Sequence, residues 1–304
     1  MRNSTFRPVS ARSAVMCSQK QSQAGRVPTD PHQHAVKIAE SVDETWHRVH
    51  GSGQLEIPVS VVGALAFLAP PDDERDDVVS CLLSLSAGDF SDFARMQWAI
   101  FVKARPDLVN RAWPLISLWH GESRLDDQAV SAAKSVADAA LRAEQLHLTG
   151  TDRRRETDLF GALLEVLRSR TAKSARGQFY TPACVADAMA RMVGVPGEGE
   201  RVLEPTAGTG ALLRAAAEAM RELDHDPSTV EWWAVDVDEL AVACLAVNAV
   251  LWGLGNKVVL GVGNGLTDEW MPRALAERRE PMELASAIRC MADLIRITER
   301  PAGG

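Results

Sequence analysis

The chain has 304 residues, which is room for one large domain or two ordinary ones. Hydrophobic residues make up 46% and charged residues 24% of the sequence. That composition is typical of a folded globular protein and excludes a collagen or a mostly disordered chain. The formal net charge of −8 excludes a positive field over the whole protein, so any contact with nucleic acid requires a local basic patch.

The cysteines and the apolar runs indicate the compartment. Five cysteines lie far apart, at positions 17, 81, 184, 244 and 290, and no CxxC pair points to zinc or redox chemistry. We therefore expect reduced thiols and a cytoplasmic protein. The longest apolar run, residues 59–69, falls short of the ~20 residues that cross a bilayer.

The first half of the chain predicts helices only. Residues 1–30 are rich in Ser, Gln and Arg without an apolar period, which predicts a disordered tail. Asp30 and Pro31 then supply an N-cap and a first-turn proline. Apolar residues at a spacing of three to four predict an all-helical domain over residues 31–150. Its expected helices cover residues 31–50, 58–70, 72–85, 89–103, 106–119 and 126–148.

Several aromatic residues of this domain invite a functional interpretation. Trp98, Trp113 and Trp119 occupy amphipathic positions, so we expect them in the helical core, although stacking on nucleic-acid bases is the alternative. Four histidines, at positions 32, 34, 47 and 50, do not predict a metal site, because no cysteine or carboxylate completes a ligand set.

Residues 152–175 are expected to form one basic helix. Between residues 153 and 176, seven basic side chains oppose three acidic ones, a charge of about +4 in a chain of −8. Such a helix either exposes a solvated face or contacts phosphate groups. The candidate DNA-contacting residues are Arg153, Arg154, Arg155, Arg168, Arg170 and Lys173.

The pattern changes at residue 177 from helices alone to alternating strands and helices. The segment GQFYTP, residues 177–182, precedes a helix, and the order strand–helix–strand–helix–strand follows. We therefore expect an α/β fold in which a parallel, partial Rossmann-like core over residues 177–266 belongs to a second domain, residues 151–304. The expected elements are a helix at 183–193, a strand at 202–203, a helix at 211–223, a strand at 231–235, a helix at 239–251 and a strand at 257–260.

The residues at the strand ends indicate a ligand. Gly208 and Gly210 let a ligand approach the backbone closely. Glu204 would repel a pyrophosphate and suits a cationic amine. Asp236 is placed to accept hydrogen bonds from ribose hydroxyls, and the Asn264 amide can pair with an adenine edge. An amine, a ribose and an adenine without phosphate describe S-adenosylmethionine.

The segments GQFYTP, LEPTAGTGALL, VDVDELAVACLAVNA and GNGL, in this order, resemble the adenine-N6 DNA methyltransferase family. The likeness is greatest to the modification subunits of type I restriction systems and covers about residues 150–270. It implies S-adenosylmethionine as cofactor, DNA as partner, and a further protein chain. It also implies that Phe179, Tyr180 and Thr181 close over the methionine end of the cofactor. The remaining implied cofactor contacts are Glu204, Pro205, Ala207, Gly208, Gly210, Asp236 and Asn264.

The sequence departs from that family at its catalytic motif. The family carries an Asn/Asp-Pro-Pro-aromatic tetrapeptide that holds the flipped base, whereas the only Pro-Pro here is Pro70–Pro71. The 39 residues after Gly265 predict two helices, 268–279 and 281–298, and no fourth strand. The first strand would then be an open edge, covered either by those helices or by a second chain.

These observations leave two main functional hypotheses, while a third, a methyltransferase that acts on small molecules or RNA, would require a substrate lid for which the sequence offers no candidate. The first is a cofactor-binding member of the methyltransferase family, truncated or one half of a split enzyme, and inactive alone. The second is a DNA- or protein-binding module whose cofactor site is vestigial or sensory.

Overall fold

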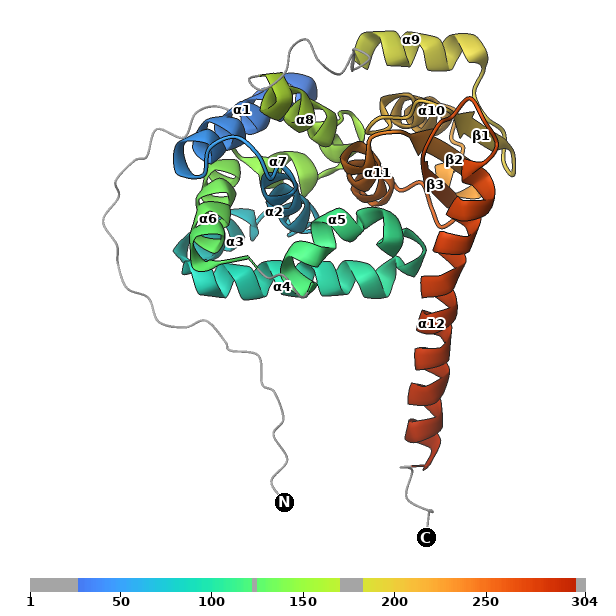
Figure 1. Ribbon diagram of the computed structural model, residues 1–304. Helices are drawn as coiled ribbons and strands as arrows, with labels where there is room; N and C mark the ends of the chain where they lie inside the picture. Colours follow the sequence, from blue (N-terminus) through green and yellow to red (C-terminus); the bar gives the residue numbers. More distant parts are fainter. Residues whose placement is uncertain (1–26, 122–124, 170–182, 299–304) are drawn as a thin grey trace.

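The computed structural model describes residues 27–121, 125–169 and 183–298 (Figure 1). Most of the tail that we expect over residues 1–30 lies outside them. The first part of the chain is helical throughout, and several of its helices begin at side-chain N-caps: Asp30, Ser86 and Asp126 each accept a backbone N–H of the first turn. The helices are α1 (Pro31–Val49), α2 (Glu56–Ala66), α3 (Arg75–Ser84), α4 (Ala87–Ala104), α5 (Val109–His120), α6 (Asp127–Arg142), α7 (Gln145–Thr149) and α8 (Leu159–Ser169).

The helix predicted over residues 126–148 is divided in the structure. It forms α6 and α7, separated by a turn in which Glu144 adopts a left-handed conformation with φ of 68°. Beyond the turn the buried Gln145 amide donates to the Val62 carbonyl at 2.8 Å. This long-range hydrogen bond is a tertiary effect that the local apolar period does not contain. The predicted helix 106–119 likewise begins as a short 3-10 turn, Pro106–Leu108, ahead of α5.

The basic helix predicted over residues 152–175 is also divided. Asp152–Arg155 form a 3-10 turn, and α8 begins only at Leu159. The Asp158 side chain accepts the Gly161 N–H at 2.8 Å and thereby starts a new helix. A capping residue in the middle of a periodic stretch therefore explains the break.

The core of the helical part contains two of the three tryptophans expected there. Trp98 and Trp119 are buried, and the Trp119 indole donates to the Ser60 hydroxyl at 2.8 Å. Trp113 is 47% exposed, so its predicted place in the core is wrong. The buried face of α5 consists of Ala112, Leu115, Ile116 and Trp119, and Trp113 lies off that face.

Three parallel strands follow in the order β1-β2-β3, namely β1 (Arg201–Glu204), β2 (Glu231–Asp236) and β3 (Val258–Val262). One face of this sheet packs against helices α10 (Ala211–Glu222) and α11 (Glu239–Leu251), and its residues share one continuous core with the helical part. Helix α9 (Ala183–Val193) packs on α10, and α11 lies between the sheet and the helical part (Figure 1). The helical domain and α/β order predicted from the sequence are therefore confirmed, without a break in the core at residue 150.

The chain then continues as a single long helix, α12 (Trp270–Thr298), instead of the two predicted helices. The predicted break lay at Pro281, which cannot donate a hydrogen bond to the carbonyl of Glu277. In the structure the Asn110 amide of α5 donates to that carbonyl at 2.6 Å, so the helix continues past the proline. A side chain distant in sequence therefore satisfies the group that would otherwise favour a helix end.

Helix α12 covers only part of the second face of the sheet. Its residues Trp270 and Ala274 pack with Val235 and Val259, on β2 and β3. Among the described residues β1 pairs with β2 alone, and Leu203 on β1 is 50% exposed. The terminal helix therefore does not cover the open edge. No helix of the described segments is long and apolar enough to span a membrane.

Candidate functional site

The ends of the three strands gather the polar residues singled out in the sequence. Strand β1 ends at Glu204, β2 ends at Asp236, and Asn264 lies two residues beyond the end of β3. Because the strands are parallel, their carboxyl ends form one edge of the sheet, which is where open α/β sheets bind ligands.

The Asp236 carboxylate joins the loops that follow β1 and β2. Its Oδ2 accepts the Gly208 N–H at 2.7 Å, and its Oδ1 accepts the Asp238 N–H at 2.9 Å. The Ala207 N–H also donates to the Val235 carbonyl at 3.0 Å, so the glycine loop is fixed to β2 at two points. An ionised carboxylate offers about four lone-pair sites. Each Asp236 oxygen therefore keeps one acceptor site for a ligand hydroxyl.

The Glu204 carboxylate is held by the turn that follows it. Its Oε1 accepts both the N–H and the hydroxyl of Thr206, each at 3.1 Å. Its Oε2 has no donor among the described residues. Pro205 and Thr206 are exposed, whereas Ala207 is buried beneath them. One carboxylate oxygen at the mouth of β1 is therefore available to a cationic group.

The two loop glycines meet different surroundings. Gly208 has φ of 52°, and a Cβ placed there would meet no atom within 4 Å. Gly210 has φ of 98°, and a Cβ there would collide with Leu245 and lie 3.0 Å from the Trp252 ring. Gly208 therefore leaves open space above the loop, while Gly210 permits close packing beneath it.

The loop after β3 contacts the loop after β1. Gly265 lies directly against the Pro205 carbonyl, where a side chain would collide with it. The Asn264 Oδ1 accepts the Leu266 N–H at 3.0 Å, so the orientation of this exposed amide is fixed. Its Nδ2 has no acceptor among the described residues. All three loops are thus interconnected through the backbone.

Two further groups of predicted site residues lie outside the described residues. Phe179, Tyr180 and Thr181 belong to the first group, and Arg170 and Lys173 to the second. Their cofactor and DNA contacts stay predictions.

Three of the candidate DNA-contacting arginines, Arg153, Arg155 and Arg168, make contacts within the chain, and Arg168 pairs with Asp238 at 2.5 Å. The Arg153 guanidinium donates to the carbonyls of Pro28 and Thr29, at 2.7 and 3.1 Å. Residues at the end of the expected tail are therefore attached to the helical part. Arg155 pairs with Asp152 at 3.4 Å.

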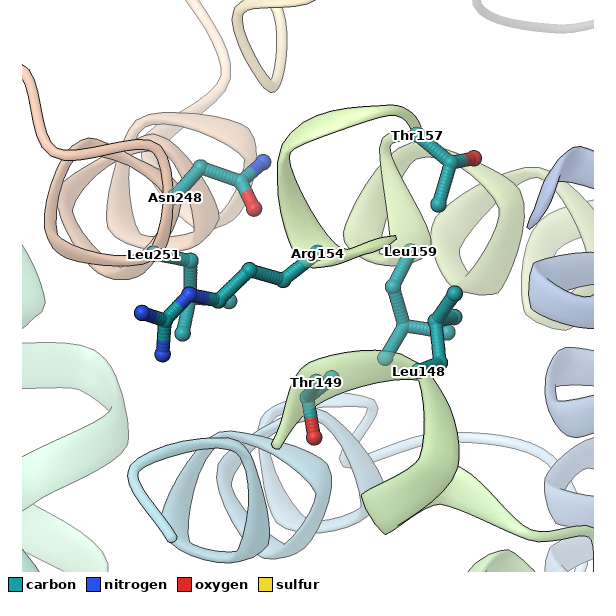
Figure 2. Close-up of a pocket in the computed structure, with 7 residues that line it drawn as sticks. All are labelled: Leu148, Thr149, Arg154, Thr157, Leu159, Asn248 and Leu251. Carbon is teal, nitrogen blue, oxygen red and sulfur yellow. The ribbon is translucent and has the colours of Figure 1, made fainter. Parts of the chain in front are cut away.

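Arg154 points into a narrow crevice between the helical part and α11 (Figure 2). Burial lowers the pKa of its guanidinium, and the neighbouring Arg155 lowers it further. The crevice is too narrow to admit a water molecule, so it is not a ligand site. Its lining residues are Leu148, Thr149, Arg154, Thr157, Leu159, Asn248 and Leu251.

A buried polar cluster beneath the glycine loop escaped the sequence analysis. The Asp158 Oδ1 accepts the Asn248 amide at 2.9 Å, and its Oδ2 accepts the Thr209 hydroxyl at 2.5 Å. Burial raises the pKa of Asp158, while the hydrogen bonds from Thr209, Gly161 and Asn248 oppose that rise. The available signal was Asn248, the one amide in the otherwise apolar stretch 240–251.

The histidines and cysteines make no metal cluster in the segments that the structure describes. His47 contacts Asp43 at 2.9 Å, and His50 stacks on Trp46. The four described cysteines are free thiols.

Comparison with known proteins found a family model that is similar to part of the chain. Residues 155–284 match the family model described as N-6 DNA methylase, which confirms the resemblance for that segment. Among solved structures, the chain is similar to the type I restriction-modification system methyltransferase subunit from Streptococcus thermophilus, with 15% identity and a TM-score of 0.42. That alignment covers 78% of this chain and 60% of the other, so the chain spans about 60% of that protein's length. No curated protein matches the chain.

Proposed function

We propose that this chain binds S-adenosylmethionine at the loops after β1, β2 and β3, and that it serves methyl transfer to adenine N6 in DNA. The family match over residues 155–284 supports the reaction class. The observation that carries the cofactor proposal is the Asp236 carboxylate, which fixes the glycine loop and still keeps acceptor sites.

The residues at this edge fit the chemistry of that cofactor. The open space over Gly208 would admit the ligand close to the backbone. The free Glu204 oxygen would attract an ammonium group, and Asp236 would accept hydrogen bonds from ribose hydroxyls. The fixed Asn264 amide would donate to an adenine nitrogen. When bound, S-adenosylmethionine supplies a methyl group on a cationic sulfur.

We further propose that these 304 residues do not methylate adenine on their own. Transfer requires that the target base leaves the helix, stacks on a ring and presents its amino nitrogen in line with the methyl group. No Asn/Asp-Pro-Pro-aromatic sequence stands in the printed chain. The base-binding groups would then come from outside these 304 residues, for example from a second protein chain.

Calorimetry with S-adenosylmethionine and with its demethylated product tests the cofactor proposal. We expect a dissociation constant in the micromolar range, roughly −7 to −8 kcal/mol. The variant Gly208→Asp is the control, since an added Cβ there meets no atom within 4 Å and the carboxylate fills the open space with charge. Absence of heat from the unaltered chain at millimolar ligand would refute binding.

Transfer of tritium from labelled S-adenosylmethionine to mixed-sequence duplex DNA tests the second proposal. We expect no N6-methyladenine above the level of the control variant. Incorporation by the chain alone would show that other residues build a base pocket.

Exposed apolar side chains favour a second candidate function, a protein-binding module. Leu284, Ile288 and Met291 of α12 are 62%, 58% and 63% exposed and recur at a spacing of three to four. Leu203 adds an exposed apolar side chain at the open sheet edge. If calorimetry detects no cofactor, this candidate replaces the first. Replacing the three α12 residues by Ser should then abolish partner binding without changing the fold.

A further inference from the structure

We infer that α8 acts as a clamp that sets the positions of the glycine loop and of the β2 loop, with Asp158 and Arg168 as its positioning residues. The role in cofactor binding rests on the proposed function. In the unliganded chain the clamp consists of hydrogen bonds at one end of α8 and an ion pair at the other.

The N-terminal end of α8 holds the glycine loop through Thr209. Asp158 accepts the Thr209 hydroxyl on one oxygen, and on the other it accepts the Asn248 amide at 2.9 Å and the Gly161 N–H at 2.8 Å. The Asn248 amide also donates to the Thr209 carbonyl at 2.9 Å. Thr209 is therefore held through its side chain and its backbone, between the two glycines that shape the loop.

The approach of α8 to the loop is close. A Cβ at Gly161 would lie 2.5 Å from the Asp158 Oδ2 and 3.0 Å from the Thr209 Oγ1. Thr209 and Asn248 are only 2% and 1% exposed. Buried hydrogen bonds of this kind are lost at a large penalty, because water cannot replace the missing partner.

The other end of α8 holds the loop after β2. Arg168 pairs with the Asp238 Oδ2 at 2.5 Å, and both side chains are largely buried. The other Asp238 oxygen caps α11, and the Asp238 N–H donates to Asp236. Arg168 therefore acts on Asp236 through one intermediate residue.

The two contacts lie at opposite ends of one helix. Arg168 lies ten positions after Asp158, about 15 Å along an α-helix. The buried face of α8, which includes Leu163, Leu164 and Leu167, belongs to the main core, and α8 packs along α1 (Figure 1). The helical part of the chain would therefore position the loops of the proposed cofactor site without any residue of α8 touching the cofactor.

Variants of Asp158 separate positioning from general stability. Asp158→Ala removes all three acceptor contacts. Asp158→Asn keeps the contacts from Gly161 and Asn248 on its oxygen, and it replaces the third by a reversed hydrogen bond in which its amide donates to the Thr209 Oγ1. The matched control is Ser60→Ala, which breaks buried hydrogen bonds to Leu115 and Trp119 within the helical core.

Amide hydrogen exchange of the unliganded protein and calorimetry are the readouts. In Asp158→Ala we expect faster exchange at residues 206–210 and binding of S-adenosylmethionine weakened about tenfold. Asp158→Asn should restore both, and Ser60→Ala should change only the unfolding midpoint. Arg168→Gln should speed exchange at residues 237–241, and Arg168→Lys should largely restore it.

The outcomes distinguish the clamp from the proposed function. If the unaltered chain binds no S-adenosylmethionine but Asp158→Ala still speeds exchange of the loop, the cofactor proposal fails and the clamp stands. If Asp158→Ala lowers the unfolding midpoint as Ser60→Ala does, with loop exchange and affinity unchanged, the clamp is overturned.

Discussion

Gly208 and Gly210 flank the same residue, yet alanine is expected to have different effects at the two positions. Both glycines have positive φ, which costs a residue with a side chain about 1–2 kcal/mol. At Gly208 nothing lies within 4 Å of an added Cβ, so the expected loss of unfolding free energy stays at about 1–2 kcal/mol. At Gly210 the Cβ collides with Leu245 and lies 3.0 Å from the Trp252 ring. Overpacking adds about 1–3 kcal/mol, for a total of about 2–5 kcal/mol.

Urea unfolding and calorimetry with S-adenosylmethionine together separate the two effects. Gly208→Ala should unfold at a slightly lower urea concentration than the unaltered chain but bind the cofactor weakly, because its methyl group enters the open space over the loop. Gly210→Ala should unfold at a clearly lower urea concentration. Equal stability losses, or a larger loss for Gly208→Ala, would refute the assignment of one glycine to the ligand and the other to packing.

Three further predictions concern Asp236, His34 and the three arginines at positions 153–155. Asp236→Asn replaces by an amide nitrogen one of the two oxygens that accept backbone N–H groups. Calorimetry should then show cofactor binding weakened by roughly 1–3 kcal/mol. Unchanged affinity would show that Asp236 does not contact the cofactor. Burial lowers the pKa of His34 in the folded chain below its ordinary 6.5. Below pH 6.5 the unfolded chain therefore binds a proton more readily than the folded chain, so the free energy of unfolding should fall as the pH drops. His34→Gln should flatten that dependence in melts at several pH values, and an identical profile would contradict it. Joint replacement of Arg153, Arg154 and Arg155 by Gln should lower the salt slope of DNA binding by at most about 1, since Arg153 donates to the carbonyls of Pro28 and Thr29 and Arg154 lies in the crevice. A fall of about 3 would show that all three face phosphates.

The α/β part of the structure was predictable because its signals are local. Short apolar strands ending in glycines, acids or an amide define their own boundaries, and parallel pairing then brings the strand ends to one edge. Glu204, Asp236 and Asn264 therefore lie where the sequence indicates. The strands extend only one or two residues beyond the predicted bounds.

The features that the sequence did not predict depend on distant partners. Helix α12 passes Pro281 because Asn110 donates to the carbonyl that the proline leaves without a donor. Trp113 lies off the buried face of α5, a position that periodicity alone placed in the core. The α8 clamp joins Asp158 to Asn248 across 90 positions, and no local pattern connects them.

Photolabelling with tritiated S-adenosylmethionine, followed by peptide mapping, tests most directly whether the three loops form a cofactor site. Label should appear on peptides that contain residues 204–210, 236–238 or 264–266, or on the aromatic residues at 179–180, and excess demethylated product should prevent it. Label elsewhere on the chain, or label that the demethylated product does not displace, would contradict cofactor binding at this edge of the sheet.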